Sequence, residues 1–259
     1  MRTGNPILQS DAFRLPADWS NLAAAKPRVM TVMGTVHASM ILLGLTASAA
    51  IASWAVIDAN PALTFPLTSG GAIVGFILAL VIHFSPARAP YLAWVYALLE
   101  GVFLGGISLV VARSAGPEGA TIVLQAVLLT FGIFGSLLLL YRAGLVRIGG
   151  AAARMIAIAT AGVFFTYLAA FVLRMVGIEA PLMHELIGFG RAGLLGIGFS
   201  VFVVILASFN LVLDFQFIED AAASGAPKHM EWYGAFGLLV TLVWLYIEVL
   251  RLLSKLRRD

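Results

Sequence analysis

The sequence contains no cysteine and few charges: of its 259 residues, only 11% are Asp, Glu, Lys or Arg. The absence of cysteine excludes disulfide bonds, thiolate metal sites and cysteine nucleophiles. A soluble domain has about a quarter of its residues charged and about 45–50% apolar, whereas 61% of this chain is hydrophobic. The hydrophobic core of a single soluble domain of this size could not bury so many apolar side chains. The surrounding solvent must therefore be lipid.

Motifs of common enzyme classes are also missing. There is no Gly-x-Ser-x-Gly or P-loop pattern, and Asp214 lacks the Gly-x-Gly-Asp context of an intramembrane aspartyl protease. His184-Glu185 starts a zinc-protease-like string, but Gly188 occupies the position of the second histidine. We therefore predict that the chain is not an enzyme, and we expect no cofactor beyond transient Ca²⁺. An intramembrane hydrolase is the least favoured interpretation.

The net charge of +3 would suggest nucleic-acid binding in a soluble protein. Here, Lys and Arg lie mainly between and beyond apolar runs, as they do around membrane spans. The expected partner is the lipid bilayer, and no nucleic acid is expected. Residues 1–28 lack the continuous apolar segment of a signal peptide. We interpret them as a polar tail before a single membrane domain over residues 29–259.

Seven segments are apolar and long enough to cross a membrane, which takes roughly 20 residues as a helix. Lipid-exposed backbone must satisfy its own hydrogen bonds, so helices are predicted rather than open strands. Turn-forming residues, including Asn60-Pro61, Ser85-Pro86 and Gly116-Pro117, separate several of them. The fold class is thus all-α integral membrane, with the side of the C-terminus left open. The expected spans are 31–57, 67–84, 91–112, 121–141, 155–176, 191–217 and 231–253.

Three acids interrupt these spans, although a charged side chain at a helix centre costs about 2.5–3.5 kcal/mol on the insertion scale. Glu100 lies roughly 14 Å into its segment. It could form an interhelical hydrogen bond or belong to an ion or proton pathway. Asp214 could reach the interface, but Phe215, Phe217 and Ile218 continue the apolar face beyond it. The neighbouring Glu219 and Asp220 are better candidates for solvation.

Glu248 is followed by Arg251 at i+3, so a local ion pair is one interpretation. Another is that Asp214 and Glu248, on successive helices, share a proton. Two close carboxylates resist double ionisation and titrate as a unit. Ionised, they would repel each other and offer hard oxygen ligands to a cation such as Ca²⁺. Straight helices would leave the two acids about 15 Å apart along the axis, so pairing requires a tilt, a kink or an irregular connection.

Three strings resemble one family. They are MRTGNPIL at the start, VYALLEGVFLGGISLV around Glu100, and APKHMEWYGAFGLLVTLVWLYIEVLRLLSKL near the end. The sequence resembles the Bax inhibitor (transmembrane Bax-inhibitor-motif, YccA-like) family in its actinobacterial form. The resemblance covers nearly the whole chain. It implies seven helices with the last one central and surrounded by the other six, in a bacterial plasma (inner) membrane.

The resemblance also implies a pH-sensitive calcium leak gated by an acidic pair on helices six and seven. The sixth-helix acid corresponds to Asp214 in LDFQFIE, and the seventh to Glu248 in LYIE, where relatives usually have Asp. Glu100 is expected to line or stabilise the interior, with Glu219, Arg251 and His83 as secondary candidates. The segment from His83 to Arg88 has no clear equivalent of the arginine that contacts the pair in some relatives. The alternative function is a non-transporting regulator that binds a membrane protease or another stress-response partner.

Overall fold

A computed structural model describes residues 29–178, 180–190 and 192–256. Within these ranges, seven helices are long and apolar enough to cross a membrane. This confirms the predicted fold class. The predicted tail, residues 1–28, lies outside the described residues. The long helices are α2 (Val32–Ala59), α3 (Thr64–Phe84), α4 (Ala89–Ser114), α5 (Gly119–Arg142), α6 (Gly150–Met175), α8 (Leu194–Ala223) and α9 (Met230–Leu256), and a short helix, α7 (Pro181–Ile187), precedes α8.

Proline and glycine set the sharp connections between these helices. The short 3-10 turns η3 (Pro61–Leu63), η4 (Pro86–Arg88) and η5 (Gly116–Glu118) each begin within one residue of a proline. Proline suits the start of a helical turn because its fixed φ is already helical and its missing N–H would have no partner there. At the end of α8, Gly225 adopts a φ of 72°, which a residue with a Cβ rarely tolerates. The chain therefore reverses tightly between α8 and α9.

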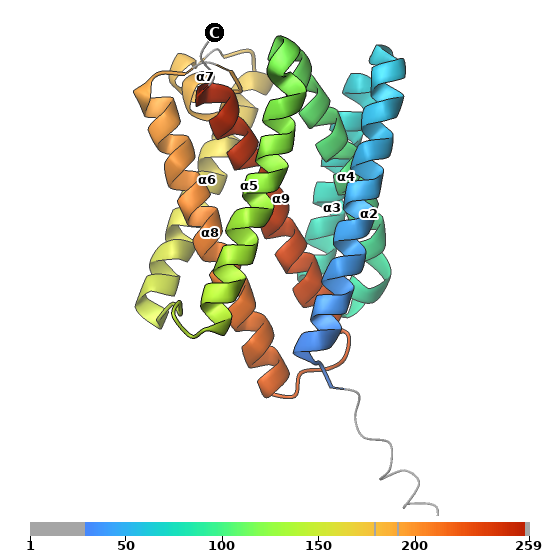
Figure 1. The fold of residues 1–259 in the computed structure, drawn as a ribbon, viewed down its shortest axis with the longest axis vertical. Coiled ribbons are helices and arrows are strands. Elements are labelled where there is room, and N and C mark those ends of the chain that lie inside the picture. Colours follow the sequence, from blue (N-terminus) through green and yellow to red (C-terminus); the bar gives the residue numbers. More distant parts are fainter. Residues whose placement is uncertain (1–28, 179, 191, 257–259) are drawn as a thin grey trace, which may run out of the picture.

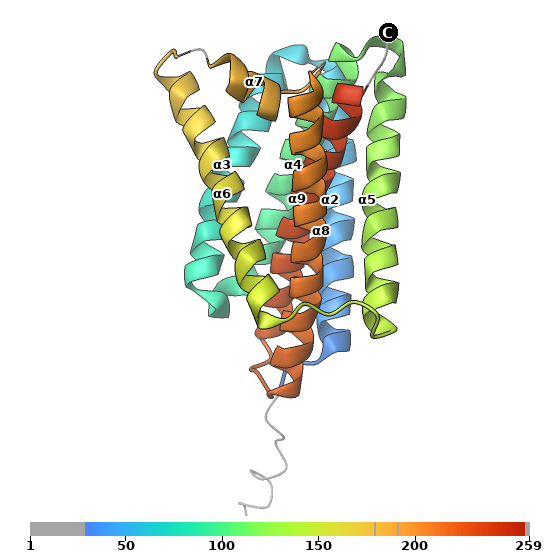
Figure 2. The ribbon, with the colours of Figure 1, turned by 90° about the vertical axis from the view of Figure 1, so that its left-hand side faces the viewer.

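The helices run up and down across one bundle (Figure 1). The start of α2 and the α8–α9 turn lie at one end, while the C-terminal end of α9 and the short helix α7 lie at the other (Figures 1 and 2). We call these the turn end and the α7 end. The odd number of crossings puts the first and last described residues at opposite ends of the bundle.

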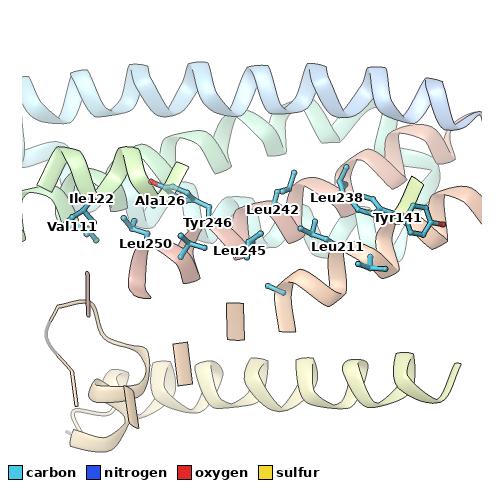
Figure 3. Packing of buried hydrophobic residues seen from close by; sticks show 14 of the residues in the cluster. Val111, Ile122, Ala126, Tyr141, Leu211, Leu238, Leu242, Leu245, Tyr246 and Leu250 are labelled. Carbon is cyan, nitrogen blue, oxygen red and sulfur yellow. The ribbon is translucent and has the colours of Figure 1, made fainter. Parts of the chain in front are cut away.

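Helix α9 packs against α2, α4, α5 and α8. Its side chains join a buried apolar cluster in which Leu211, Leu245 and Leu250 are completely buried (Figure 3). The remaining part of the resemblance, a last helix surrounded by all six others, stays a prediction. The cluster fixes α9 against α8, the two helices that carry the acids of interest.

Large apolar side chains cover the outside of the bundle. Phe65 is 79% exposed and Leu194 is 90% exposed. Such exposure would be costly in water but is ordinary for surfaces that face lipid. The exposed surface agrees with the composition, and the protein is a multi-pass membrane protein.

Candidate functional site

Asp214 on α8 faces a cavity of about 420 Å³ between α3, α8 and α9. His83, near the end of α3, lines the same cavity, together with Tyr233 and Thr241 from α9. The structure thus brings together two of the predicted site residues, Asp214 and His83. His83 is exposed, so the cavity reaches the molecular surface near the turn end.

The carboxyl group of Asp214 is only partly satisfied. The Thr241 side chain is a hydrogen-bonding neighbour, but Oδ2 is buried and has no hydrogen-bond partner among the described residues. Leaving a buried polar atom unpaired costs about 1–3 kcal/mol, and more for a charged group. Such an atom beside a cavity is suited to meet a proton, a water molecule or a cation.

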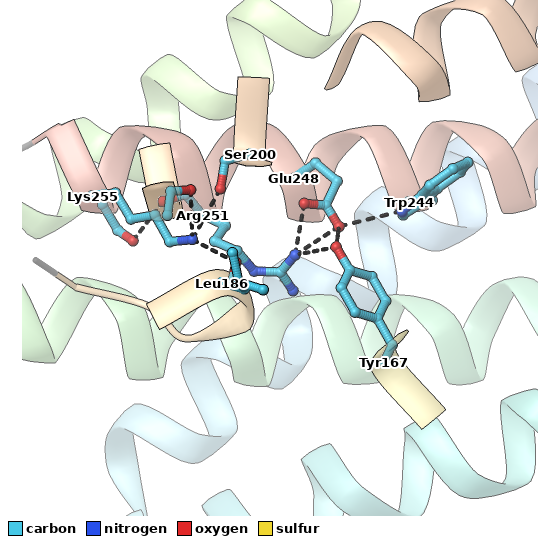
Figure 4. A network of polar contacts seen from close by, with 9 residues as sticks. Tyr167, Leu186, Ser200, Trp244, Glu248, Arg251 and Lys255 are labelled. Atoms are coloured by element: carbon cyan, nitrogen blue, oxygen red, sulfur yellow. Dashed lines mark hydrogen bonds and ion pairs between the residues drawn. The ribbon is translucent and has the colours of Figure 1, made fainter. Parts of the chain in front are cut away.

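Glu248 lies in a different environment. It is completely buried, and Arg251 Nη1 lies 2.7 Å from its Oε1 and 2.6 Å from its Oε2. The Tyr167 hydroxyl on α6 donates to Oε1 at 2.6 Å, and Trp244 Nε1 donates to the same oxygen at 3.2 Å. Figure 4 shows this group converging on one face of α9. The local ion pair with Arg251, one of the two interpretations of Glu248, is confirmed.

Aromatic rings hold the Arg251 guanidinium group in place. It lies 5.1 Å from the ring centre of Tyr167 and 5.3 Å from that of Phe189, in the segment between α7 and α8. These distances suit cation–π contacts, which gain strength where water is absent. The ion pair is therefore attached to α6 and to the α7–α8 segment as well as to its own helix.

One turn beyond Arg251, Lys255 ties α7 to the bundle. The side chain is buried, and its Nζ donates to Leu186 O at 2.7 Å, Gly196 O at 3.1 Å and Ser200 Oγ at 3.0 Å (Figure 4). An ammonium group has three N–H donors, and each has an acceptor here. Lys255 thus joins α7, α8 and α9 at the α7 end.

The structure does not bring Asp214 and Glu248 together. No hydrogen bond or ion pair between described residues links them. Asp214 lines the same cavity as Gly237 and Thr241 of the antiparallel helix α9, whereas Glu248 is about 10 Å beyond Thr241 along α9 at 1.5 Å per residue. In this structure the two acids therefore do not form the expected proton-sharing pair, and the Ca²⁺ site made by both acids stays a prediction. No cluster of three or more potential metal-binding side chains occurs among the described residues.

The two remaining acidic candidates, Glu100 and Glu219, lie apart from both the Asp214 cavity and the Glu248 ion pair. Glu100 is buried where α4 meets α3: a Cβ on Gly75 would lie 3.1 Å from its Oε2, and Tyr96 is its hydrogen-bonding neighbour. It lines neither the Asp214 cavity nor the Glu248 group. Glu219 accepts hydrogen bonds from Tyr141 and Arg147 and is about half exposed. This partly exposed position fits the expectation that Glu219 is better solvated than Asp214.

Sequence reasoning did not identify Tyr167 or Lys255. The spacing of Glu248, Arg251 and Lys255, at i, i+3 and i+7, places all three on one face of a helix, and this pattern was a usable signal for Lys255. Tyr167 follows two phenylalanines and a threonine in an apolar helix. Nothing local distinguishes it, because its role depends on the packing of α6 beside α9.

Comparison with known proteins supports the resemblance. A family model described as Bax inhibitor 1 like matches residues 5–258, almost the full chain. Searches of curated proteins and of solved structures returned no match. The prediction that the chain is not an enzyme is untested by these comparisons. The family match and the seven apolar helices together establish that this chain is a membrane protein of the Bax inhibitor family.

Proposed function

We propose that this protein is a pH-sensitive cation leak, for which calcium is the first candidate ion, in a bacterial plasma membrane. The observation that carries the proposal is the half-buried Asp214, whose buried Oδ2 has no hydrogen-bond partner among the described residues, beside a cavity that reaches the surface at His83. Ionisable groups inside membrane proteins most often mark ion or proton pathways.

The cavity supports entry of cations from the turn end. An ionised Asp214 would attract a cation and supply a hard oxygen ligand of the type that Ca²⁺ prefers. The described residues contain no complete metal cluster. A single carboxylate favours transit over tight binding, and rapid conduction requires that the ion also leave.

Beyond Asp214, the proposed pathway is closed in this conformation. The fully buried Leu211 and Leu245 belong to the packed apolar cluster between α8 and α9. Farther along, the Glu248–Arg251 ion pair, held by Tyr167, occupies the interior. We propose that this pair is the second barrier, and that opening requires α6 or the α7–α8 segment to release Arg251.

The expected sign of the pH effect follows from the groups that face the cavity. Acidification adds a proton to Asp214, which removes its negative charge and with it the attraction for a cation. We therefore expect the leak to increase as pH rises and to fall as pH drops.

The test is calcium flux into proteoliposomes loaded with a fluorescent indicator, measured across a range of pH. Asp214→Asn should remove most of the pH dependence and lower flux at high pH. The matched control is Asp220→Asn, the same change on the same helix at an exposed position. An unchanged pH profile in a folded Asp214→Asn protein would contradict the proposed sensor.

The second candidate function is that of a non-transporting regulator, motivated by the likeness to YccA-like proteins. It predicts flux equal to that of empty vesicles, together with a membrane protease or another stress-response protein that co-purifies in stoichiometric amounts. The flux assay therefore separates the two functions.

A further inference from the structure

A second cavity, of about 460 Å³, lies in another part of the bundle. Its two walls are α2 and α5, and its floor is formed by α4 and α9. Helices α2 and α5 do not pack extensively against each other, so the space between them forms a groove, here called the α2–α5 groove. Its size falls within the range of small-ligand sites, roughly 300–1,000 Å³.

The α2–α5 groove is chemically uniform. Its walls are apolar, with Leu43, Ala47 and Ile51 on α2 facing Val123, Val127 and Phe131 on α5. The few hydroxyl groups in its lining are already bonded: Ser108 and Tyr246 bond each other at 2.7 Å, Thr46 donates to Ala97 O, and Thr130 donates to Ala126 O. Each of these hydroxyl groups already has a partner, so the lining offers little to a polar ligand. The lining therefore selects hydrocarbon.

Small residues make the groove. Ala47, Ala50 and Ala55 on α2 line it where larger side chains would fill it. Ala47 and Ala55 are exposed on the surface that faces the bilayer. Because lipid chains surround this surface, the groove is within reach of acyl chains of the bilayer.

A cation suited to a phosphate, Arg113, lies beyond one end of the groove and outside its lining. Trp54 and Ala55 line that end, and Asp58 follows one turn later on the same helix face. Arg113 on α4 reaches Asp58 Oδ1 at 2.9 Å and Asp58 O at 3.4 Å through Nη2 alone. A guanidinium group has five N–H donors, so Arg113 can also donate to a phosphate. Arg113 lies in the last turn of α4 with its side chain partly exposed, and the ends of membrane-spanning helices are at the expected level of lipid head groups.

We propose that the α2–α5 groove is a phospholipid site, in which one acyl chain lies between α2 and α5 and the phosphate contacts Arg113. The floor includes Leu242, Val243 and Tyr246 of α9, the helix that also carries Glu248. A bound chain thus contacts the helix on which both proposed barriers depend. The lipid site itself does not rest on the leak function, because a non-transporting protein would bind the chain equally well.

Photo-crosslinking tests the site. Purified protein in nanodiscs receives a trace of phosphatidylglycerol with a diazirine in one acyl chain, and labelled peptides are identified by mass spectrometry. Labelling should concentrate on the groove faces of α2 and α5 and should saturate as probe increases. Uniform, non-saturating labelling of all lipid-facing helices would overturn the proposal.

Two variants on α2 provide a matched pair. Ala47→Trp would fill the groove and should reduce labelling of groove peptides by roughly tenfold, because the indole replaces most of the contact surface of the chain. Ala52→Trp makes the same change at an exposed position outside the groove and should leave labelling unchanged. Equal effects of the two changes in folded proteins would refute a specific site.

The head-group contact has its own test. Arg113→Gln should weaken labelling by the phospholipid probe more than labelling by a fatty-acid probe with the same diazirine chain. If phospholipid labelling is unchanged, the phosphate assignment is wrong and the occupant is a hydrocarbon chain from another source.

Discussion

At the scale of single residues, Glu248 and Arg251 show how this protein keeps charge inside a membrane. Each charge alone would be expensive to bury, but Arg251 Nη1 contacts both carboxylate oxygens of Glu248, and Tyr167 and Trp244 donate further hydrogen bonds to the carboxylate. Replacing a buried ion pair with apolar residues often leaves the stability of the protein unchanged, whereas removing one partner leaves the other as an unpaired buried charge. The same logic supports Arg251 as the residue whose release opens the second proposed barrier, because that release leaves the buried Glu248 without its partner.

A double-mutant cycle tests this coupling. Glu248→Leu or Arg251→Met alone should destabilise the protein by about 3–5 kcal/mol, because each leaves a buried charge without its partner. The double variant should recover much of that loss. Thermal unfolding in detergent, followed by tryptophan fluorescence and circular dichroism, measures all four proteins. A double variant that loses as much as the sum of the single ones would show that the two residues are energetically independent.

At the scale of helices, a buried carboxylate joins the start of α2 to the start of α9. Glu231 Oε1 accepts from Thr31 N at 2.9 Å, Thr31 Oγ1 at 2.8 Å and Lys228 Nζ at 2.7 Å. Met30 N also donates to Ala226 O at 2.7 Å. We call this group of hydrogen bonds around Glu231 the clasp. It fixes the turn end of α9, two residues before Tyr233, where the lining of the Asp214 cavity begins.

Gly34 makes room for the clasp, and a pair of glycine substitutions tests it. A Cβ at position 34 would lie 2.0 Å from Glu231 Oε1, whereas one at Gly44 on the same helix would meet nothing within 4 Å. Gly34→Ala should therefore cost about 1–3 kcal/mol through forced displacement. Gly44→Ala should be neutral or stabilising by about 0.5–1 kcal/mol, since alanine favours helix. Thermal unfolding of both variants decides the matter, and equal midpoints would refute the clasp.

Most of the helices could be predicted because hydropathy is a local property. Each expected span overlaps a long observed helix, with errors mainly at the ends: α6 begins at Gly150 instead of 155 and α8 extends to Ala223 instead of 217. The short helix α7 was missed because seven residues are too few for a periodic signal. The sequence could not decide whether Glu248 pairs with Arg251, three residues away, or with Asp214 on the neighbouring helix. Only the packed arrangement of α6, α8 and α9 settles that choice.

At the scale of the whole molecule, the orientation in the membrane can be predicted from the basic residues that flank the helices, and buried basic residues must be left out of that comparison. Arg251 and Lys255 are used inside the bundle, so they do not count as flanking charges at the α7 end. Among the described residues, the exposed basic residues in and near the connections divide unevenly. The turn end has Arg88, Arg142, Arg147, Arg154 and Lys228, whereas the α7 end has Arg113 and Arg174.

Cytoplasmic loops carry the excess of Lys and Arg, so the turn end should face the cytoplasm, and with it the mouth of the Asp214 cavity. Because the chain lacks cysteine, single-cysteine variants can report this without background. Ala87→Cys and Ser224→Cys, at the turn end, should react with a membrane-impermeant maleimide only after cells are permeabilised. Glu118→Cys, an exposed position at the α7 end, should react in intact cells. The reverse pattern would place the cavity on the outside, so that external pH, and not cytoplasmic pH, would act on Asp214.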